Sequence, residues 1–337
     1  MSALGLDRLE PAASPDYWRE FDDIREKDAA AVTHVRASDG YNLTVYEFGK
    51  GNPESVMVVN PLVTPFLLLA GLAGTLAERY HVISWENRGG PFLHESLGDI
   101  ATSLDRQGQD LIEISQAFDL EAFHAITYCS GAPIVARAAS QADLPIRSIS
   151  LYAPSGAGIA DKRSQYQDVF APMILQAGTA ETREARRIAK VMQDYVRARH
   201  ADDELVSEIS RLTYLNMRDL DAITGFARVM ADYWAGDMDE RLAQFDEMCR
   251  RHPVMVMHSL DDPVVHYSAS IKACERSGRA KLVLYPTGGH FKLCERGSEA
   301  ARDVMSFMAS HEAEETPAWP ALRPGLYLGP LWAVDWT

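Results

Sequence analysis

The sequence predicts an α/β fold, in which a mostly parallel sheet has helices on both faces and receives an all-helical insert. Short apolar runs typical of strands buried on both faces alternate with helical segments over residues 54–156 and again over 251–311. Between them, residues 157–250 show only helical periodicity. Such an insert is most simply a cap over the carboxyl edge of the sheet, where these sheets bind their ligands.

The first half of the chain contains most of the expected strands. Asp39-Gly40 is a hairpin signal that joins two strand-like runs at residues 30–37 and 41–49. The run "ESVMVVNP" at 54–61 is continuously apolar, as expected of a strand buried on both faces. Further along, we expect a helix near 67–79, a strand at 80–87, a helix at 100–118, a strand at 123–128, a helix from Ser130 and a strand at 146–154.

The second half contains the helical insert and the return of the strands. In the insert, one apolar series has the spacing i, i+3, i+4, i+7, i+8 of an amphipathic helix, and a shorter series indicates a second helix. The first series is Ile188, Val191, Met192, Tyr195 and Val196, and the second is Leu205, Ile209 and Leu212. Strands are expected again within 252–263 and 280–291, before a last helix at 297–311.

These patterns divide the chain into a lead-in, a core, a cap and a tail. The prolines and glycines of the tail exclude regular structure, yet it holds Trp319, Trp332 and Trp336, half of the six tryptophans. The tail is either a strap docked on its own domain or a surface for a partner or for a second subunit in a homodimer. The boundaries are residues 1–28 for the lead-in, 29–156 and 251–315 for the α/β core, 157–250 for the helical cap, and 316–337 for the tail.

The composition excludes several classes of partner. The formal net charge is −15 and no run of Lys or Arg exceeds two residues, so the chain lacks the basic surface that binds nucleic acid or an anionic membrane. The longest apolar stretch, residues 66–77, is too short to span a bilayer, and the N-terminus has no apolar signal region. We therefore expect a cytoplasmic protein without a membrane anchor.

The cysteines indicate neither a metal site nor a disulfide framework. Cys129, Cys249, Cys274 and Cys294 are far apart and show no metal-binding spacing. In a reducing cytoplasm we expect them to be free thiols. Because no motif for a nucleotide, a flavin or a metal is apparent either, the sequence predicts chemistry that needs no cofactor.

The stretch "TYCSGA" lies between an expected strand and an expected helix. A nucleophile in a sharp strand-to-helix turn needs small residues two positions before and after it, because the turn brings them together. A turn centred on Ser130 would place the large Tyr128 there, whereas a turn centred on Cys129 places Thr127 and Gly131 there. Steric reasoning therefore favours Cys129 as nucleophile and the backbone N–H of Ser130 as a donor to a developing oxyanion.

A thiol nucleophile needs a base, and the base needs an acid that orients it. The stretch "MHSLDDPVVH" places Asp261 and Asp262 just past the end of one expected strand. The stretch "YPTGGHF" places His290 in a glycine-rich loop after the next strand. Register favours Asp262 as the acid, and the order nucleophile, acid, base is the one expected on this architecture.

With these motifs the chain resembles the α/β-hydrolase superfamily over roughly residues 30–310. The matching pieces, in order, are "YNLTVYEFGKG", "VMVVNPLVTP", "HVISWENRGGP", "TYCSGA", "HSLDDPVV" and "GGHF". The resemblance implies a mostly parallel sheet of eight strands, a helical cap and a catalytic triad, here Cys129, His290 and Asp262. It also implies that the loop after the third strand donates a second backbone N–H to the oxyanion, at the position of Leu62.

This loop departs from the His-Gly usual in the family, because it reads Asn60-Pro61-Leu62, and Val63 is the nearby alternative donor. Around the reacting atoms we expect a substrate pocket. Its candidate residues are Val63, Tyr128, Phe226 and Trp234. The apolar content of the cap suits a hydrophobic or aromatic acyl chain.

The cysteine itself narrows the expected chemistry. Most members of the superfamily use serine, whereas cysteine stands at this turn in dienelactone hydrolases, polyhydroxyalkanoate synthases and some thioesterase-like cyclases and acyltransferases. A thiolate exchanges with a thioester at little thermodynamic cost, and the acyl-cysteine remains activated. The resemblance therefore implies acyl transfer from a CoA or carrier-protein thioester through Cys129 to an acceptor or water. The alternatives are hydrolysis of a small ester, lactone or C–C bond, and a catalytically silent receptor or interaction protein.

Overall fold

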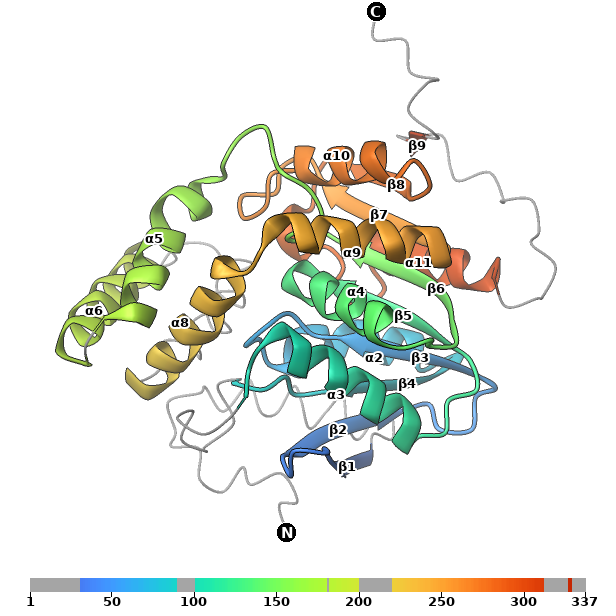
Figure 1. The fold of residues 1–337 in the computed structure, drawn as a ribbon. Coiled ribbons are helices and arrows are strands. Elements are labelled where there is room, and N and C mark those ends of the chain that lie inside the picture. Colours follow the sequence, from blue (N-terminus) through green and yellow to red (C-terminus); the bar gives the residue numbers. More distant parts are fainter. Residues whose placement is uncertain (1–30, 90–100, 181, 200–219, 312–326, 329–337) are drawn as a thin grey trace, which may run out of the picture.

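The computed structural model describes residues 31–89, 101–180, 182–199, 220–311 and 327–328. A twisted sheet has helices on both faces, and further helices stand beside one end of it (Figure 1). The strands lie in the order β1-β2-β4-β3-β5-β6-β7-β8-β9. The pairings from β4 through β3, β5, β6 and β7 to β8 are all parallel, so the predicted fold class is confirmed.

The strands occupy the expected apolar runs. Strands β5 and β7 are buried at every residue, because helices cover both faces of the sheet at its centre. The hairpin of β1 and β2 is antiparallel, and β2 joins the parallel strands through an antiparallel pairing with β4. The bounds are β1 (Ala31–Arg36), β2 (Asn42–Phe48), β3 (Glu54–Val59), β4 (Tyr80–Trp85), β5 (Phe123–Tyr128), β6 (Ile146–Tyr152), β7 (Val254–Ser259), β8 (Lys281–Tyr285) and β9 (Tyr327–Leu328).

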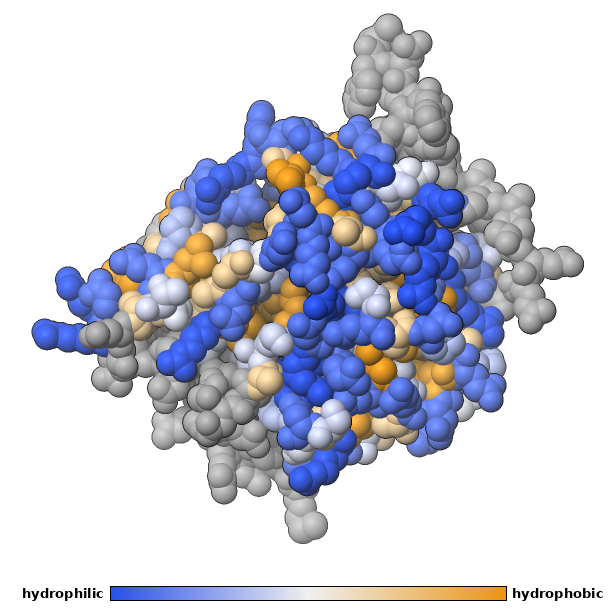
Figure 2. Space-filling view, viewed as in Figure 1, coloured by the Kyte–Doolittle hydropathy of each residue, from blue (hydrophilic) through white to orange (hydrophobic). Residues whose placement is uncertain are grey.

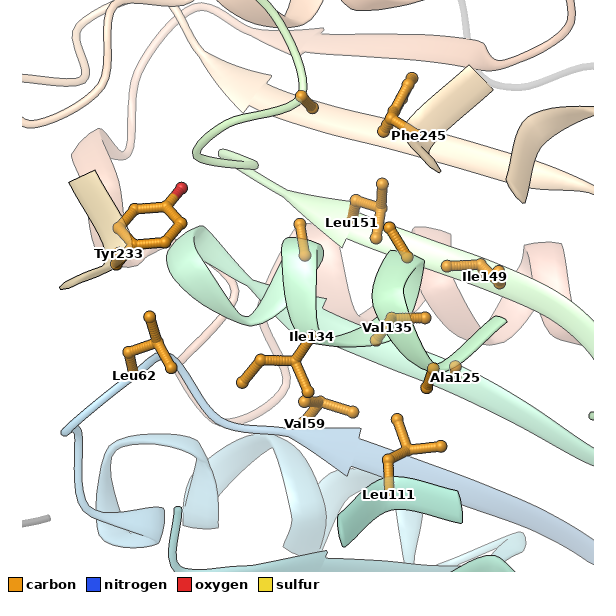
Figure 3. Close-up of a cluster of buried hydrophobic side chains, with 14 of the residues drawn as sticks. Val59, Leu62, Leu111, Ala125, Ile134, Val135, Ile149, Leu151, Tyr233 and Phe245 are labelled. Atoms are coloured by element: carbon orange, nitrogen blue, oxygen red, sulfur yellow. The ribbon is translucent and has the colours of Figure 1, made fainter. Parts of the chain in front are cut away.

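The core helices form two layers, one on each face of the sheet. Helices α3 (Leu104–Ala117), α4 (Ala132–Gln141), α9 (Met238–Arg251) and α10 (Ser268–Ser277) contribute to one apolar cluster, and α2 (Ala70–Leu76) and α11 (Glu299–Ala309) to another. Figure 3 shows the first cluster, where Val59 of β3 and Ile149 of β6 lie beside Ile134 and Val135 of α4. Short 3₁₀ turns at Phe66–Leu69 and Cys129–Gly131 precede α2 and α4.

The cap consists of helices that pack on one another beside the sheet. Helices α5 (Gln165–Thr179), α6 (Thr182–Arg199) and α8 (Leu220–Ala235) form this group, which stands apart from the core in Figure 1. Helix α9 falls inside the range expected for the cap, yet it packs against α4 and α10 of the core. The predicted range 157–250 is therefore too long at its C-terminal end. The helix expected around Leu205, Ile209 and Leu212 lies outside the described residues.

Two sequence predictions need correction: one about the apolar face of α6 and one about regular structure in the tail. On α6, Ile188 and Met192 are buried, whereas Val191 is 57% exposed, so the inward stripe is narrower than the spacing suggests. Figure 2 shows apolar side chains on this cap region among mostly polar ones. In the tail, Tyr327–Leu328 forms β9, which pairs antiparallel with β8, so regular structure is not excluded there. The rest of residues 316–337, with its tryptophans, and the lead-in at 1–28 lie outside the described residues.

Candidate active site

The turn after β5 has the strained geometry that the steric argument requires. Cys129 has a φ of +50°, a left-handed conformation that is uncommon for residues with a Cβ. A Cβ placed on Gly131 would lie 2.1 Å from Thr127 Oγ1 and 2.8 Å from the carbonyl oxygen of Val59. Only glycine therefore fits two residues after Cys129, and Cys129, not Ser130, is the apex of the turn.

Backbone strain collects at the ends of three neighbouring strands. Val63, Cys129 and Ala153 all have positive φ, and they follow or end β3, β5 and β6, which are adjacent in the sheet. Strained residues of this kind persist only where the surrounding structure holds them, and they often mark functional sites. The backbone N–H of Ser155 donates to the Cys129 carbonyl at 3.0 Å, which ties two of these loops together.

The structure brings His290 and Asp262 together. Nδ1 of His290 lies 2.7 Å from Oδ2 of Asp262, and both side chains are buried. The His290 loop is held by the carboxylate of Asp261, which accepts hydrogen bonds from the backbone N–H groups of Gly288 and Gly289 at 3.2 and 2.8 Å. The two adjacent aspartates thus have different contacts: Asp262 meets the imidazole and Asp261 meets its loop.

Asp262 also has a second histidine partner that the sequence analysis missed. Nε2 of His258, on β7, lies 3.1 Å from Oδ2 of Asp262, and the other carboxylate oxygen accepts from the N–H groups of Val264 and Val265. Burial raises the pKa of Asp262, but the charge of His290 and the hydrogen bonds from both histidines hold it well below its usual range. Asp262 is therefore a carboxylate at neutral pH. The spacing His258-x-x-x-Asp262 at the end of a buried strand was the signal available in the sequence.

His290 connects this carboxylate to the cysteine. Its ring has a hydrogen bond to Asp262 on Nδ1. Burial lowers the pKa of His290, but the charge of Asp262, the neighbouring Cys129 and the hydrogen bond to Asp262 raise it more, to about 10. The imidazolium form is thus stabilised between a carboxylate and a half-buried thiol. This arrangement can move a proton between Cys129 and a reacting group.

The predicted oxyanion donors are differently engaged. The backbone N–H of Leu62 donates to Oγ of Ser130 at 3.0 Å, and both residues are buried. The Leu62 N–H, the predicted second oxyanion donor, is thus hydrogen-bonded to the Ser130 hydroxyl in this structure. Ser130 is in place next to Cys129, at the start of the turn into α4.

The loop after β3 is anchored by two polar residues that the sequence analysis did not single out. Asn87 donates to the carbonyl oxygens of Asn60 and Pro61 at 2.7 and 3.0 Å. The carboxylate of Glu86 accepts from the N–H of Phe66, and from the Tyr46 hydroxyl at 3.0 Å. Burial raises the pKa of Glu86 to about 7, because these neutral donors only partly offset the loss of water.

The candidate pocket residues have different surroundings. Val63 is fully buried beside Leu62. Tyr128 is also buried, and its ring centroid lies 4.9 Å from that of His290, within the apolar cluster on the α2 and α11 face. It therefore supports the imidazole from the face opposite to α4. Phe226 and Trp234 are half-buried on α8 and pack against the apolar cluster on the α4 face.

Two tyrosines of the cap, which the sequence analysis did not name, come close to the site. Tyr166 of α5 is stacked on Phe170 with ring centroids 5.4 Å apart, and Tyr233 of α8 shares a hydrogen bond of 3.0 Å with Ser155. Burial, and then the charge of Cys129, raise the pKa of Tyr166. Figure 3 places Tyr233 and Leu62 at the end of α4 that follows the turn. The cap thus reaches the site with aromatic rings.

Over the described part of the chain, no cluster of three or more His, Cys, Asp or Glu side chains is arranged to hold a metal ion. In the same residues, no helix has both the length and the apolarity that crossing a membrane demands. All four cysteines are free thiols, as expected.

Comparisons with known proteins agree with the fold. A model of the family described as "alpha/beta hydrolase fold" matches residues 64–296. No curated protein matches the sequence of this chain.

Solved structures resemble the chain at low identity. A putative lipase from Acinetobacter baumannii has 14% identity and a TM-score of 0.67, with 91% of this chain and 99% of that chain covered. A putative aryl esterase from Burkholderia cenocepacia has 16% identity and a TM-score of 0.61, covering 83% and 99%. The 2-hydroxy-6-oxo-6-phenylhexa-2,4-dienoate hydrolase from Rhodococcus has 15% identity and a TM-score of 0.60, covering 83% and 98%. At such identities the likeness shows the fold alone, and with the family match it establishes that this chain belongs to the α/β-hydrolase family.

Proposed function

We propose that the protein transfers an acyl group from a thioester or activated ester through a covalent acyl-Cys129 intermediate. One observation supports this most directly: Asp262 is hydrogen-bonded to His290, and Cys129, whose charge acts on His290, stands at the strained apex of the turn. This is the geometry of a nucleophile, its base and the acid that orients the base.

The reaction balances with these residues alone. His290 holds the proton as the imidazolium beside the Cys129 thiolate, and the thiolate attacks the carbonyl carbon, so that a C–S bond forms and the carbonyl electron pair moves to oxygen. The tetrahedral intermediate then collapses and expels the leaving thiol or alcohol, which takes the proton from His290. An acceptor hydroxyl, amine or water next gives its proton to His290 and attacks the acyl-cysteine, which regenerates the thiolate. Asp262 stays ionised throughout.

A thioester donor is favoured because sulfur replaces sulfur in the first step. The exchange of one thioester for another is nearly neutral in free energy, whereas the acyl-cysteine remains reactive towards an acceptor. The aromatic rings of Tyr166 and Phe170, and the half-buried Phe226 and Trp234, suit an apolar acyl chain under the cap. CoA and carrier proteins are the donor classes to test.

The test is the intact mass of the protein after incubation with acetyl-, hexanoyl-, benzoyl- and dodecanoyl-CoA. We expect one acyl group on the wild type and none on Cys129→Ala. The matched control is Cys294→Ala, a second half-buried cysteine, which should acylate like the wild type. Acylation of Cys129→Ala at the wild-type rate would show that Cys129 is not the nucleophile.

Hydrolysis of a small ester, lactone or C–C bond is the second candidate. It is favoured by the names of structural neighbours, which include esterases and a 2-hydroxy-6-oxo-6-phenylhexa-2,4-dienoate hydrolase. Turnover of aryl esters and lactones together with inertness to every acyl-CoA would select this candidate.

A silent receptor is the remaining alternative. It predicts that iodoacetamide alkylates Cys129 no faster than a free thiol, and that His290→Ala leaves this rate unchanged. A faster rate that falls in His290→Ala excludes it.

A further inference from the structure

The Ser130 hydroxyl is a buried donor whose proton is unused. A serine hydroxyl has one proton to donate and two lone pairs that accept. Ser130 Oγ accepts the hydrogen bond from Leu62 N–H at 3.0 Å, and among the described residues it donates to no acceptor. Its exposure is only 5%, so water does not readily replace a partner.

Two other buried serines donate their proton, whereas the hydroxyl of Ser150 on β6 has no partner among the described residues. Ser84 donates to the Val58 carbonyl at 2.7 Å, and Ser115 donates to the Ile112 carbonyl at 2.8 Å. A buried polar hydrogen without an acceptor is costly, so one that is left unpaired calls for a reason. A ligand oxygen that is present only during the reaction would be such a reason.

The position of Ser130 suits that role. It directly follows Cys129, and its hydroxyl lies beside Leu62 N–H, where relatives in this fold are expected to hold the second oxyanion donor. Because the N–H of Leu62 occupies one lone pair of Oγ, the O–H is directed away from Leu62. Donation from Leu62 also polarises the hydroxyl and makes it a stronger donor.

We propose that the side-chain hydroxyl of Ser130, together with its own backbone N–H, binds the oxyanion formed on attack by Cys129. Leu62 N–H acts through this hydroxyl by orienting it. The inference rests on the proposed acyl-Cys129 chemistry. No proton is transferred in this step: the carbonyl oxygen gains the electron pair of the C=O bond, and Ser130 O–H donates a hydrogen bond to it.

The test compares two reactions of Cys129 that differ in whether an oxyanion forms. Acylation by p-nitrophenyl acetate passes through an oxyanion, whereas alkylation by iodoacetamide is a displacement at carbon that forms none. For Ser130→Ala we expect acylation to slow by about 10²-fold, the usual effect of losing one oxyanion donor, and alkylation to stay within about twofold. Both rates are measured by stopped flow and assigned to Cys129 by peptide mass.

Ser150→Ala is the matched control. Ser150 is a buried serine on β6 whose hydroxyl has no partner among the described residues. Its loss should change neither rate. If Ser130→Ala does not fold, Ser130→Cys replaces the hydroxyl with a weak donor of similar size and should slow acylation by about tenfold.

Three results would overturn the inference. They are acylation of Ser130→Ala at the wild-type rate, faster acylation, which would make the hydroxyl a plug over Leu62 N–H, and an equal fall in acylation and alkylation. Failure of the proposed function looks different, because Cys129→Ala would then be acylated like the wild type whatever Ser130 does.

Discussion

Two clusters of buried charge lie near the carboxyl edge of the sheet. In one, the charged groups pair with one another, whereas in the other a charged group also neighbours a reactive thiol. The Arg88 cluster consists of Arg88 with Asp39, Asp110, Arg106 and Glu113. The guanidinium of Arg88, 1% exposed, donates two hydrogen bonds to Asp110 at 2.7 and 2.9 Å and two to Asp39 at 2.6 and 3.0 Å. Hydrogen bonding from Arg88 lowers the pKa of the Asp39 carboxyl to about 2.

The Asp262 cluster consists of Asp262, His258 and His290, and one of its members, His290, is available to exchange a proton with a reacting group. The Asp262 carboxylate accepts hydrogen bonds from four donors, and the Asp110 carboxylate accepts them from two guanidiniums. The difference is that one donor to Asp262, His290, also neighbours the thiol of Cys129. The difference teaches that burial of charge alone does not mark a site. In the Asp262 cluster the buried charge is hydrogen-bonded to a histidine that neighbours a reactive thiol.

The largest expected effect is on the rate of acylation. His290→Gln removes the base and the proton carrier, so single-turnover acylation of Cys129 should fall by about 10³–10⁴-fold. His266→Gln, outside the Asp262 cluster, should acylate normally. A His290→Gln rate within tenfold of the wild type would place the base elsewhere.

The same variant should alter stability at alkaline pH. The folded protein holds the pKa of His290 at about 10, above the 6.5 of a free histidine, so it binds the proton more tightly than the unfolded chain does. This stabilisation is complete below pH 6.5 and is lost as the pH rises through 10. Urea unfolding between pH 7 and 10 should therefore show a steeper loss for the wild type than for His290→Gln.

Next in size is the effect of breaking the Arg88 cluster. Asp110→Ala removes one of the two carboxylates that pair with the buried Arg88, which should lower the free energy of unfolding by about 3–5 kcal/mol. Asp105→Ala, which removes an exposed carboxylate from the same helix, should cost under about 1 kcal/mol. Acylation by the folded fraction should be unchanged, and a selective loss of rate would contradict the distinction between the clusters.

The sequence predicted the parts of this molecule that depend on local sterics and periodicity. The apolar runs mark the strands, and the size of Tyr128 selects Cys129 as the apex, because both constraints act within a few residues. The contact of Asp262 with His290 followed from the order of the strands, since the carboxyl ends of parallel strands meet at one edge.

The sequence could not predict contacts that depend on where distant loops settle. Leu62 N–H donates to Ser130 Oγ across 68 residues of sequence. No local sequence pattern indicates which backbone N–H a distant serine hydroxyl will accept from. Tyr166 and Tyr233 lie on cap helices whose periodicity is the same whether they face the site or one another. The end of the cap was missed for a similar reason, because an amphipathic helix such as α9 suits either layer.

Glu86 is a buried carboxylate without an ion pair to any other described residue, so it tests the role of the partner charges in both clusters. Because the pKa of Glu86 is about 7 in the folded protein, above its unfolded 4.5, the folded state binds the proton more tightly. The wild type should therefore lose about 2–3 kcal/mol of stability as the pH rises from 4.5 through 7, and Glu86→Gln should lose less. Urea unfolding over pH 4.5–8 measures this difference.

Tyr46→Phe gives the matching variant for Glu86. The Tyr46 hydroxyl donates to the carboxylate and holds its pKa down, so its removal should move the loss of stability to higher pH. An unchanged pH profile in both variants would mean that Glu86 stays ionised and that partner charges matter less than the comparison implies.

The smallest expected effect concerns His258, which belongs to the Asp262 cluster. As in the Arg88 cluster, the polar atoms of its side chain all have hydrogen-bond partners. Its Nδ1 meets Ser270 Oγ at 2.7 Å and its Nε2 meets both the Val265 carbonyl at 2.9 Å and Asp262. Since a carbonyl only accepts, Nε2 holds the proton and donates to Asp262. Neither nitrogen is left for chemistry, so His258 should act as a positioning residue.

His258→Phe removes this donor and should slow acylation of Cys129 by at most about tenfold at pH 7, because Asp262 keeps its other donors. It should also weaken the depression of the Asp262 pKa. The stabilisation from that carboxylate, present above its unfolded pKa and lost on acidification, would then disappear at a higher pH than in the wild type. His258→Gln, which retains an amide donor, should restore much of both effects. If His258 only fills space, both variants should lose stability on acidification at the same pH as the wild type. That result would show that His258 does not position Asp262.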